Sequence, residues 1–230
     1  MKNYNAVKYL TVLLQTTDEN DNQYAGTGFF LHYEIDGVTV PVIVTVRHVV
    51  ENSTQTIMTF HYKPEGSEHI AAADILCRPQ WFSLEDCELC CCLLNPISQE
   101  FERITGSPVY YAKLLESSIL TEDKLQELEI LTEIALIGYP GGLTSSPMRY
   151  PFLRTGRLAS APSDNRSNGG GYVDITAVGG SSGSPILLNG GTAKLIGIMN
   201  QVVPSAEFGV YIDAYHLLRL KEQVKMMRKD

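Results

Sequence analysis

The run at residues 179–184 places serines among glycines, in the order Gly-Gly-Ser-Ser-Gly-Ser, between two strand-like segments. A serine flanked by glycines can sit on a tight turn in which backbone N–H groups converge. Acyl transfer to a serine hydroxyl needs such a turn, because negative charge develops on the carbonyl oxygen of the substrate. Taken alone, the same run is also typical of a Gly/Ser-rich hairpin loop, so the interpretation depends on a second group.

A histidine could remove the proton from such a serine. His48 ends an apolar run that starts at residue 42 and is typical of a buried strand. A lone histidine in that place is commonly a hydrogen-bonded core side chain. The role of general base requires a serine within hydrogen-bond reach and an acid on the far ring nitrogen. The chain supplies the three residue types in the order histidine, acid, serine.

Four further stretches stand in order along the chain: Gly-Thr-Gly-Phe-Phe at 26–30, Gly-Tyr-Pro-Gly-Gly at 138–142, Thr-Gly-Arg-Leu at 155–158 and Gly-Ile-Met at 197–199. With the serine loop and His48 they resemble the trypsin-like (chymotrypsin-fold) serine peptidases, and most of all the bacterial peptidase domains of the HtrA kind. In that family they correspond to the GxGF strand, a GYP-type turn, a strand with the pattern xxGxV and the strand that lines the substrate cleft. The resemblance spans nearly the whole chain.

The resemblance implies that Ser182 is the nucleophile and that His48 is the general base and acid. The backbone N–H groups of Gly180 and Ser182 are then expected to form the oxyanion hole. An acyl-enzyme would form on Ser182 and be hydrolysed by water that His48 activates. We expect no cofactor and no metal, because the Cys-x-x-Cys pair of Cys87 and Cys90 has no second ligand pair beside it.

The acid is where the chain departs from the family pattern, which has Asp-Leu-Ala or Asp-Ile-Ala opening a buried strand. Two carboxylates compete for this place, Asp86 and Glu88. Aligning Glu88 puts the small Cys90 where the family has alanine and keeps the following residues apolar. Aligning Asp86 instead puts a carboxylate into that tight buried position, which is costly without a partner. We therefore favour Glu88, with Asp86 as the alternative.

Specificity and activation follow from the same resemblance. The digestive enzymes of the family carry an aspartate before the nucleophile, where this chain has Ser181. Activation by N-terminal cleavage is therefore not expected, and either the site is preformed or a regulatory protein partner orders it. Thr176 stands where a trypsin keeps its aspartate, so a neutral, small or medium substrate residue is predicted. The predicted lining of this pocket is Thr176, Asn200, Gln201, Val202 and Gly209.

Eleven short strand-like runs predict an all-β fold, a double six-stranded antiparallel β-barrel of the chymotrypsin kind with a C-terminal α-helix. The expected units are a first barrel with the histidine and the acid (1–115), a linker with a short helix capped by Thr121 (116–132) and a second barrel with the nucleophile (133–212). The last unit (213–230) contains a helix over 214–227 that Asp213 could cap. We expect this helix to pack on the second barrel with its basic face in solvent.

Composition limits the remaining alternatives. The chain has 230 residues, 44% of them hydrophobic, and a net charge of −8, which argues against a general nucleic-acid binder. No signal peptide or membrane segment is recognised, no PDZ-like segment follows residue 213, and five cysteines make a poor disulfide framework. A cytoplasmic serine endopeptidase acting on intracellular proteins is predicted. The alternative is a catalytically silent module of the same fold that binds protein partners.

Overall fold

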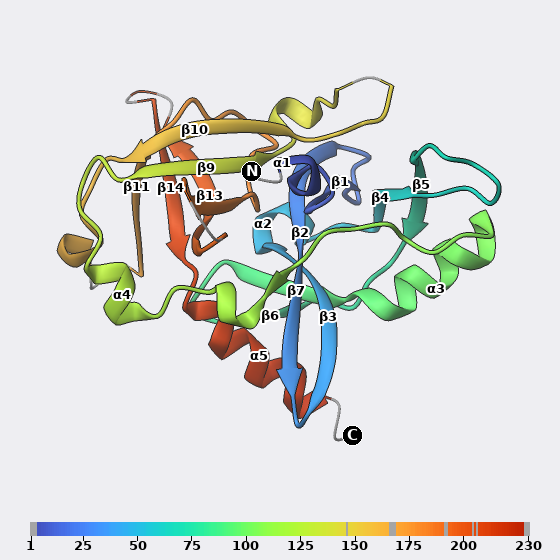
Figure 1. The fold of residues 1–230 in the computed structure, drawn as a ribbon, viewed down its shortest axis with the longest axis horizontal. Helices are drawn as coiled ribbons and strands as arrows, with labels where there is room; N and C mark the ends of the chain where they lie inside the picture. The colour runs from blue at the N-terminus through green and yellow to red at the C-terminus, as the bar shows by residue number, and fades with distance from the viewer. Residues whose placement is uncertain are drawn as a thin grey trace.

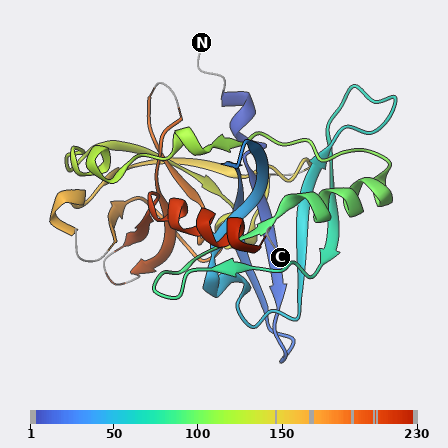
Figure 2. The same ribbon diagram turned by 90° about the horizontal axis from the view of Figure 1, so that it is seen from below.

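The computed structural model describes residues 4–145, 147–165, 169–190, 193–203, 205 and 207–227. These residues form two β-rich halves that lie side by side, with a helix running beneath them (Figures 1 and 2). The all-β, chymotrypsin-like fold with a C-terminal helix is confirmed. The predicted count of six strands holds for the C-terminal half, whereas the N-terminal half is an eight-stranded sheet.

The N-terminal sheet follows the order β5-β4-β1-β2-β3-β7-β6, and β8 pairs in parallel with β2. Its strands are β1 (Thr11–Thr17), β2 (Gln23–Ile35), β3 (Val38–Val46), β4 (Gln55–Tyr62), β5 (Ala71–Cys77), β6 (Phe82–Ser83), β7 (Leu89–Leu93) and β8 (Leu114–Leu115). Three helices belong to the same half: α1 (Tyr4–Val7), α2 (Arg47–Val50) and α3 (Leu94–Thr105).

The C-terminal half is a closed antiparallel barrel in the order β10-β11-β14-β13-β12-β9. Its strands are β9 (Glu133–Gly138), β10 (Phe152–Leu158), β11 (Gly170–Asp174), β12 (Pro185–Leu188), β13 (Leu195–Val203) and β14 (Phe208–Asp213). The other elements are the 3-10 turns η1 (Glu116–Ser118), η2 (Pro140–Gly142) and η3 (Pro162–Asn165) and the helices α4 (Glu122–Gln126) and α5 (His216–Met227).

The centre of the N-terminal sheet is apolar on both faces. Strand β3 carries alternate and consecutive β-branched residues, and its last five residues are buried. Its neighbour β7 reads Leu-Cys-Cys-Cys-Leu, and the thiols of Cys90, Cys91 and Cys92 are buried. Burial raises the pKa of all three thiols, so they are protonated and act as small apolar side chains.

Helix α5 follows the C-terminal barrel in sequence but packs on the N-terminal sheet. Its buried side chains Leu217, Leu220 and Val224 belong to the same apolar core as β1–β4 and β7, and Figure 2 shows the helix crossing the underside of the molecule. The prediction that it packs on the second barrel was wrong. Three ion pairs fasten its basic face to acids of the first half and the linker: Arg219–Asp86, Lys221–Glu116 and Lys225–Asp36.

Two details of the predicted elements also differ. Asp213 does not cap α5, because it is the last residue of β14 and the helix begins at His216. Residues 94–105 form helix α3, although no helix was predicted there. Thr121 does stand at the N-cap of α4, without a hydrogen bond from its side chain.

In the described part of the chain, no helix combines the length and the apolar character that crossing a membrane requires.

Candidate active site

The register of two neighbouring strands brings the predicted histidine and glutamate together. Strands β3 and β7 pair so that Val46 lies opposite Leu89. His48 comes two residues after β3, in helix α2, and Glu88 directly precedes β7. The pairing continues past the strand ends, since the N–H of Arg47 donates to the carbonyl of Glu88 at 2.5 Å. The two side chains meet as a consequence of sheet geometry.

The carboxylate of Glu88 accepts hydrogen bonds from two consecutive residues, Arg47 and His48. Its Oε2 lies 3.2 Å from Nδ1 of His48 and accepts the backbone N–H of the same histidine at 3.2 Å. Its Oε1 accepts a hydrogen bond from Nη2 of Arg47 at 2.7 Å. Partial burial by itself raises the pKa of the Glu88 carboxyl, but hydrogen bonds from Arg47 and His48 outweigh it and hold the pKa below its ordinary value. Glu88 is therefore an ionised acceptor for the imidazole at neutral pH.

The alternative acid, Asp86, is engaged elsewhere. Both of its carboxylate oxygens accept hydrogen bonds from Nη2 of Arg219, at 2.8 and 2.9 Å. The hydrogen bond from Arg219 lowers the pKa of the Asp86 carboxyl. Because Arg219 lies on α5, this carboxylate helps to dock the helix. The contact with His48 belongs to Glu88.

Two glycines in left-handed conformation give the serine loop its shape. Gly180 has a φ of 84° and Gly183 a φ of 85°. A Cβ at position 180 would overlap the carbonyl oxygen of Tyr139, and one at position 183 would overlap that of Thr27. Any other residue at either position would therefore be strained and would also displace its neighbours.

Thr27 connects the serine loop to the strand that leads to His48. Its hydroxyl donates to the carbonyl of Gly180 at 2.9 Å and accepts the N–H of Tyr139 at 3.0 Å. Its N–H donates to the carbonyl of Ser182 at 2.9 Å, and its carbonyl accepts the hydroxyl of Thr45 on β3 at 2.8 Å. Thr27 is fully buried, so these bonds do not compete with water. One residue of β2 thus holds the loop of the other half in register with β3.

The hydroxyl of Ser182 is partly exposed and donates to the carbonyl of Asn200 at 3.0 Å. Within the described residues it makes no hydrogen bond to His48. Among the residues that the structure describes, no acceptor forms a hydrogen bond with the backbone N–H groups of Gly180 and Ser182. The backbone N–H groups of Ser181, Gly183 and Ser184 all donate hydrogen bonds. The side chain of Ser181 is held by a hydrogen bond to the same segment: its buried hydroxyl accepts the N–H of Val178 at 3.4 Å.

Comparison with known proteins identifies the kind of molecule that carries this arrangement. Residues 26–198 match the family model described as the trypsin-like peptidase domain. The chain belongs to the trypsin-like peptidase family. It is a serine endopeptidase by family. No curated protein sequence matches the chain.

Solved structures similar to this trypsin-like peptidase are serine proteases of low sequence identity, which establishes the shared fold. The Rv3671c protease of M. tuberculosis in its active form has a TM-score of 0.59 and 14% identity, over 95% of this chain and 82% of that one. A serine endoprotease of Yersinia pestis has a TM-score of 0.57 and 15% identity, over 98% and 68%. The HtrA-type protease AlgW with a decapeptide has a TM-score of 0.54 and 13% identity, over 96% and 66%. The resemblance to HtrA-type peptidases is confirmed.

The predicted pocket residues of this peptidase come from β13, β14 and the segment before the serine loop. Asn200, Gln201 and Val202 lie on β13, and Gly209 is buried on β14. Thr176 is exposed, and its carbonyl accepts a hydrogen bond from Nη1 of Arg154 on β10. In the part of the chain that is described, no group of three His, Cys, Asp or Glu side chains could hold a metal ion.

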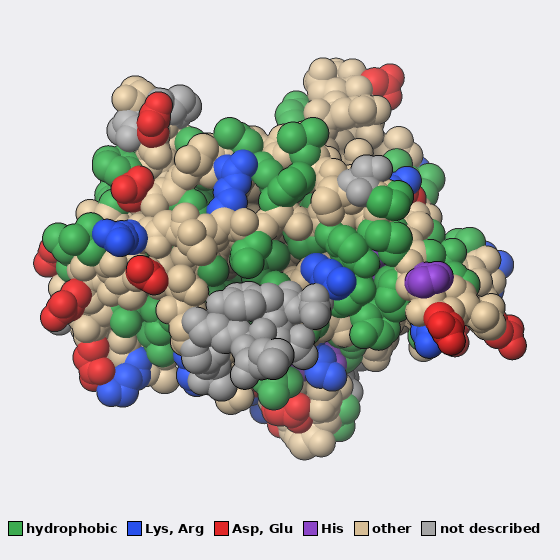
Figure 3. Space-filling model, turned by 45° about the horizontal axis from the view of Figure 1, so that its top comes forward, with side chains coloured by type: hydrophobic (Ala, Val, Ile, Leu, Met, Phe, Trp, Pro, Cys, Tyr) green, Lys and Arg blue, Asp and Glu red, His purple; other side chains and the backbone are tan. Residues whose placement is uncertain are grey.

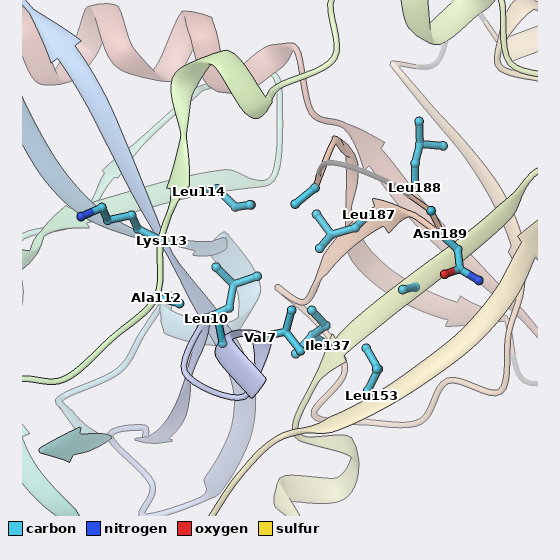
Figure 4. A pocket seen from close by; sticks show the side chains of 14 residues that line it. Val7, Leu10, Ala112, Lys113, Leu114, Ile137, Leu153, Leu187, Leu188 and Asn189 are labelled. Atoms are coloured by element: carbon cyan, nitrogen blue, oxygen red, sulfur yellow. The ribbon is translucent and has the colours of Figure 1, made fainter. Parts of the chain in front are cut away.

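A cavity of about 300 Å³ lies apart from this site, between the N-terminal segment, the segment before β8 and the barrel strands β9 and β12. Leu10, Ile137 and Leu187 project into it, while the amine of Lys113 points away (Figure 4). None of His48, Glu88 and Ser182 is among its lining residues.

The face of the molecule in Figure 3 carries side chains of both charges, interspersed with hydrophobic ones.

Sequence reasoning missed two residues that this peptidase uses to build the site. Thr27 was recognised only as part of the GxGF-like stretch, and its place between the halves depends on tertiary structure. Arg47 lies in the run that ends in His48, and its place in that run predicts no role for it. A basic residue directly before the candidate base, with a glutamate as the candidate acid, was the available signal for an ion pair.

Proposed function

We propose that the protein hydrolyses peptide bonds with Ser182 as nucleophile, His48 as general base and acid, and Glu88 as the acid that orients the histidine. The observation that supports this most strongly is the contact of Glu88 Oε2 with Nδ1 of His48 at 3.2 Å. An acceptor on Nδ1 keeps the proton on that nitrogen and leaves Nε2 free to take one. A silent member of the fold has no need of this arrangement.

The proposed reaction begins when the Ser182 hydroxyl turns from the carbonyl of Asn200 towards His48. The oxygen attacks the carbonyl carbon of the scissile bond while Nε2 of His48 takes the hydroxyl proton. The tetrahedral intermediate collapses, the C–N bond breaks and the imidazolium gives the proton to the leaving amine. Water, deprotonated by His48, then attacks the ester on Ser182. The bond from the acyl carbon to the Ser182 oxygen breaks, His48 returns the proton to that oxygen and the carboxylic acid product leaves.

The N–H groups of Gly180 and Ser182 are the proposed oxyanion hole. The carbonyl of Gly179 is anchored by the N–H of Gly141 at 2.5 Å. Because a trans peptide points its C=O and N–H in opposite directions, the N–H of Gly180 faces away from that turn. Two unbonded donors, two residues apart, can together bind a developing oxyanion.

The proposed substrate residue before the scissile bond is neutral and small or medium in size. The pocket proposed from Thr176, Asn200, Gln201, Val202 and Gly209 contains no carboxylate. The guanidinium of Arg154 at the carbonyl of Thr176 adds positive charge to the same region. A substrate arginine or lysine would meet repulsion there instead of a counter-ion.

Activity without a partner protein is also part of the proposal. Hydrogen bonds to Thr27 and bonds within the loop hold the serine loop, which supports a preformed site. The proposed substrates are intracellular proteins, because all five cysteines are free thiols.

The test uses the purified protein and its Ser182→Ala variant. A fluorophosphonate probe should label the wild-type protein and not the variant, and proteome-wide mapping should find cleavage sites that depend on Ser182. Strong selection of Arg or Lys at those sites would contradict the proposed pocket. Absence of labelling and of cleavage in the wild type would favour the silent binding module.

A further inference from the structure

We propose that Arg47 is a positioning residue that holds Glu88 in the conformation in which it orients His48. This inference rests on the proposed function of the Ser182–His48–Glu88 group and adds a fourth residue to it. The family motifs do not call for a basic residue at this place, and the role of Arg47 follows from the contacts of the two side chains.

The contacts form a closed arrangement around the Glu88 carboxylate. Oε1 accepts Nη2 of Arg47 at 2.7 Å, and Oε2 accepts both the ring and the backbone N–H of His48 at 3.2 Å. The other end of the guanidinium, Nη1, donates to the carbonyl of Leu84 at 3.3 Å. Arg47 is thereby anchored to the segment that precedes Glu88, and the carboxylate is held from both sides.

A glutamate needs this support more than an aspartate would. It has one more rotatable bond, so holding its carboxylate in one place costs more conformational entropy. Its side chain is 30% exposed, so packing alone does not immobilise it. The distance from the Glu88 carboxylate to Nδ1 of His48, 3.2 Å, is long for a charge-assisted hydrogen bond, whereas the distance to Nη2 of Arg47, 2.7 Å, is short.

The shape of the guanidinium suits this task. Its planar fork reaches the Glu88 carboxylate and the Leu84 carbonyl at once, which a lysine amine cannot reproduce with the same geometry. Arg47 therefore influences the orientation of His48 through the position of the Glu88 carboxylate.

The experiment measures kcat and KM for wild type, Arg47→Gln, Arg47→Lys, Glu88→Gln and the double variant Arg47→Gln/Glu88→Gln. Arg103→Gln is the matched control, because it removes an equally short Arg–Glu contact, 2.6 Å, on α3. We expect Arg47→Gln to lower kcat/KM by about tenfold to a hundredfold, mainly in kcat. Arg47→Lys should recover part of kcat.

The double variant tests whether Arg47 acts through Glu88. If it does, the double variant has the activity of Glu88→Gln alone, since the positioning residue has nothing left to position. Losses that multiply, or an Arg47→Gln enzyme with wild-type kcat, would overturn the proposal. Circular dichroism and thermal unfolding of every variant exclude loss of folding as the cause.

A spectroscopic measurement separates this proposal from the proposed function. With ¹⁵N-labelled histidine, the Nδ1–H of His48 should give a protected resonance in the wild type that is lost or shifted in Arg47→Gln and kept in Arg103→Gln. If the wild type is as inert as Ser182→Ala but the resonance responds in this way, the hydrolytic function fails and the positioning role stands. A resonance that does not change overturns the positioning role.

Discussion

The backbone N–H of Thr27 donates to the carbonyl of Ser182 at 2.9 Å, across the boundary between the two halves. The Thr27 hydroxyl adds a bond to the neighbouring carbonyl of Gly180 and accepts the N–H of Tyr139. A loop that carries a nucleophile in one half is therefore ordered by a strand of the other. The conformation of the serine loop and the stability of the interface are coupled through this one residue.

Replacing Thr27 by valine should disturb the conformation of the serine loop and lower the stability of the interface between the two halves. Valine keeps the shape of the side chain but removes the hydroxyl, which leaves buried polar partners unsatisfied and costs about 1–3 kcal/mol in the free energy of unfolding. We expect kcat/KM to fall about tenfold or more as the loop loses its geometry. Urea unfolding and peptide hydrolysis measure the two effects. Thr27→Ser retains the hydroxyl and should stay near wild type, and equal behaviour of the two variants would contradict the role of the hydroxyl.

The two candidate acids should respond differently to amide substitution. Glu88→Gln loses the charge that stabilises the imidazolium and disturbs the tautomer of His48, so kcat should fall by a factor on the order of 10³–10⁴. Asp86→Asn weakens an exposed contact with Arg219 on α5 and should lower the melting temperature slightly while activity is kept. A fully active Glu88→Gln together with an inactive Asp86→Asn would reverse the assignment.

Gly183→Ala should disrupt the nucleophile loop. The new methyl group would overlap the carbonyl of Thr27 and the hydroxyl of Thr45, at a φ of 85° that disfavours any side chain. We expect a loss of about 3 kcal/mol or more in stability, together with loss of probe labelling at Ser182. Gly37→Ala is the control, because that glycine also has a positive φ, 77°, but has no atom near its missing Cβ. It should cost less stability and leave labelling intact.

Stability should depend on pH through Asp213. Burial, followed by the charge of Glu122, raises the pKa of this carboxyl to about 7, and its Oδ1 has no hydrogen-bond partner among the described residues. The unfolded chain releases this proton near pH 4, so the unfolding free energy declines as pH rises from about 4 to 7 and levels off above that range.

Asp213→Asn removes this titration and supplies the test. The variant should gain stability relative to wild type between pH 5 and pH 8, by about 1–3 kcal/mol. Urea denaturation of both proteins at a series of pH values measures the difference. A difference that stays constant with pH would show that Asp213 titrates normally in the folded protein.

The motifs predicted the fold because each consists of residue types that a local backbone geometry requires. Glycine at positions 180 and 183 permits the left-handed backbone found there, and the apolar residues before His48 form a buried strand. The preference for Glu88 over Asp86 rested on the small side chain of Cys90, which is buried on β7 as that argument requires. The structure brings Glu88 to His48, and the functional role of the pair stays a prediction until the variants are measured.

Other features depend on neighbours that lie far away in sequence. Helix α3 has a helical spacing in Leu94, Ile97 and Phe101, but Leu94 also continues the apolar run of β7, and a short apolar run does not distinguish a strand from the start of a helix. The alanines that open β5 have weak strand preference and acquire their structure by pairing with β4. The partners of Arg47 and of α5 are set by tertiary contacts, which no local pattern encodes.

The crossing of α5 back to the first half has a consequence for biosynthesis. Leu217, Leu220 and Val224 complete the core that β1–β4 and β7 begin, yet they are translated after the entire C-terminal barrel. While the barrel is being synthesised, the N-terminal half therefore has an apolar face that α5 has not yet covered. The half that carries His48 and Glu88 cannot complete its core before α5 has emerged from the ribosome.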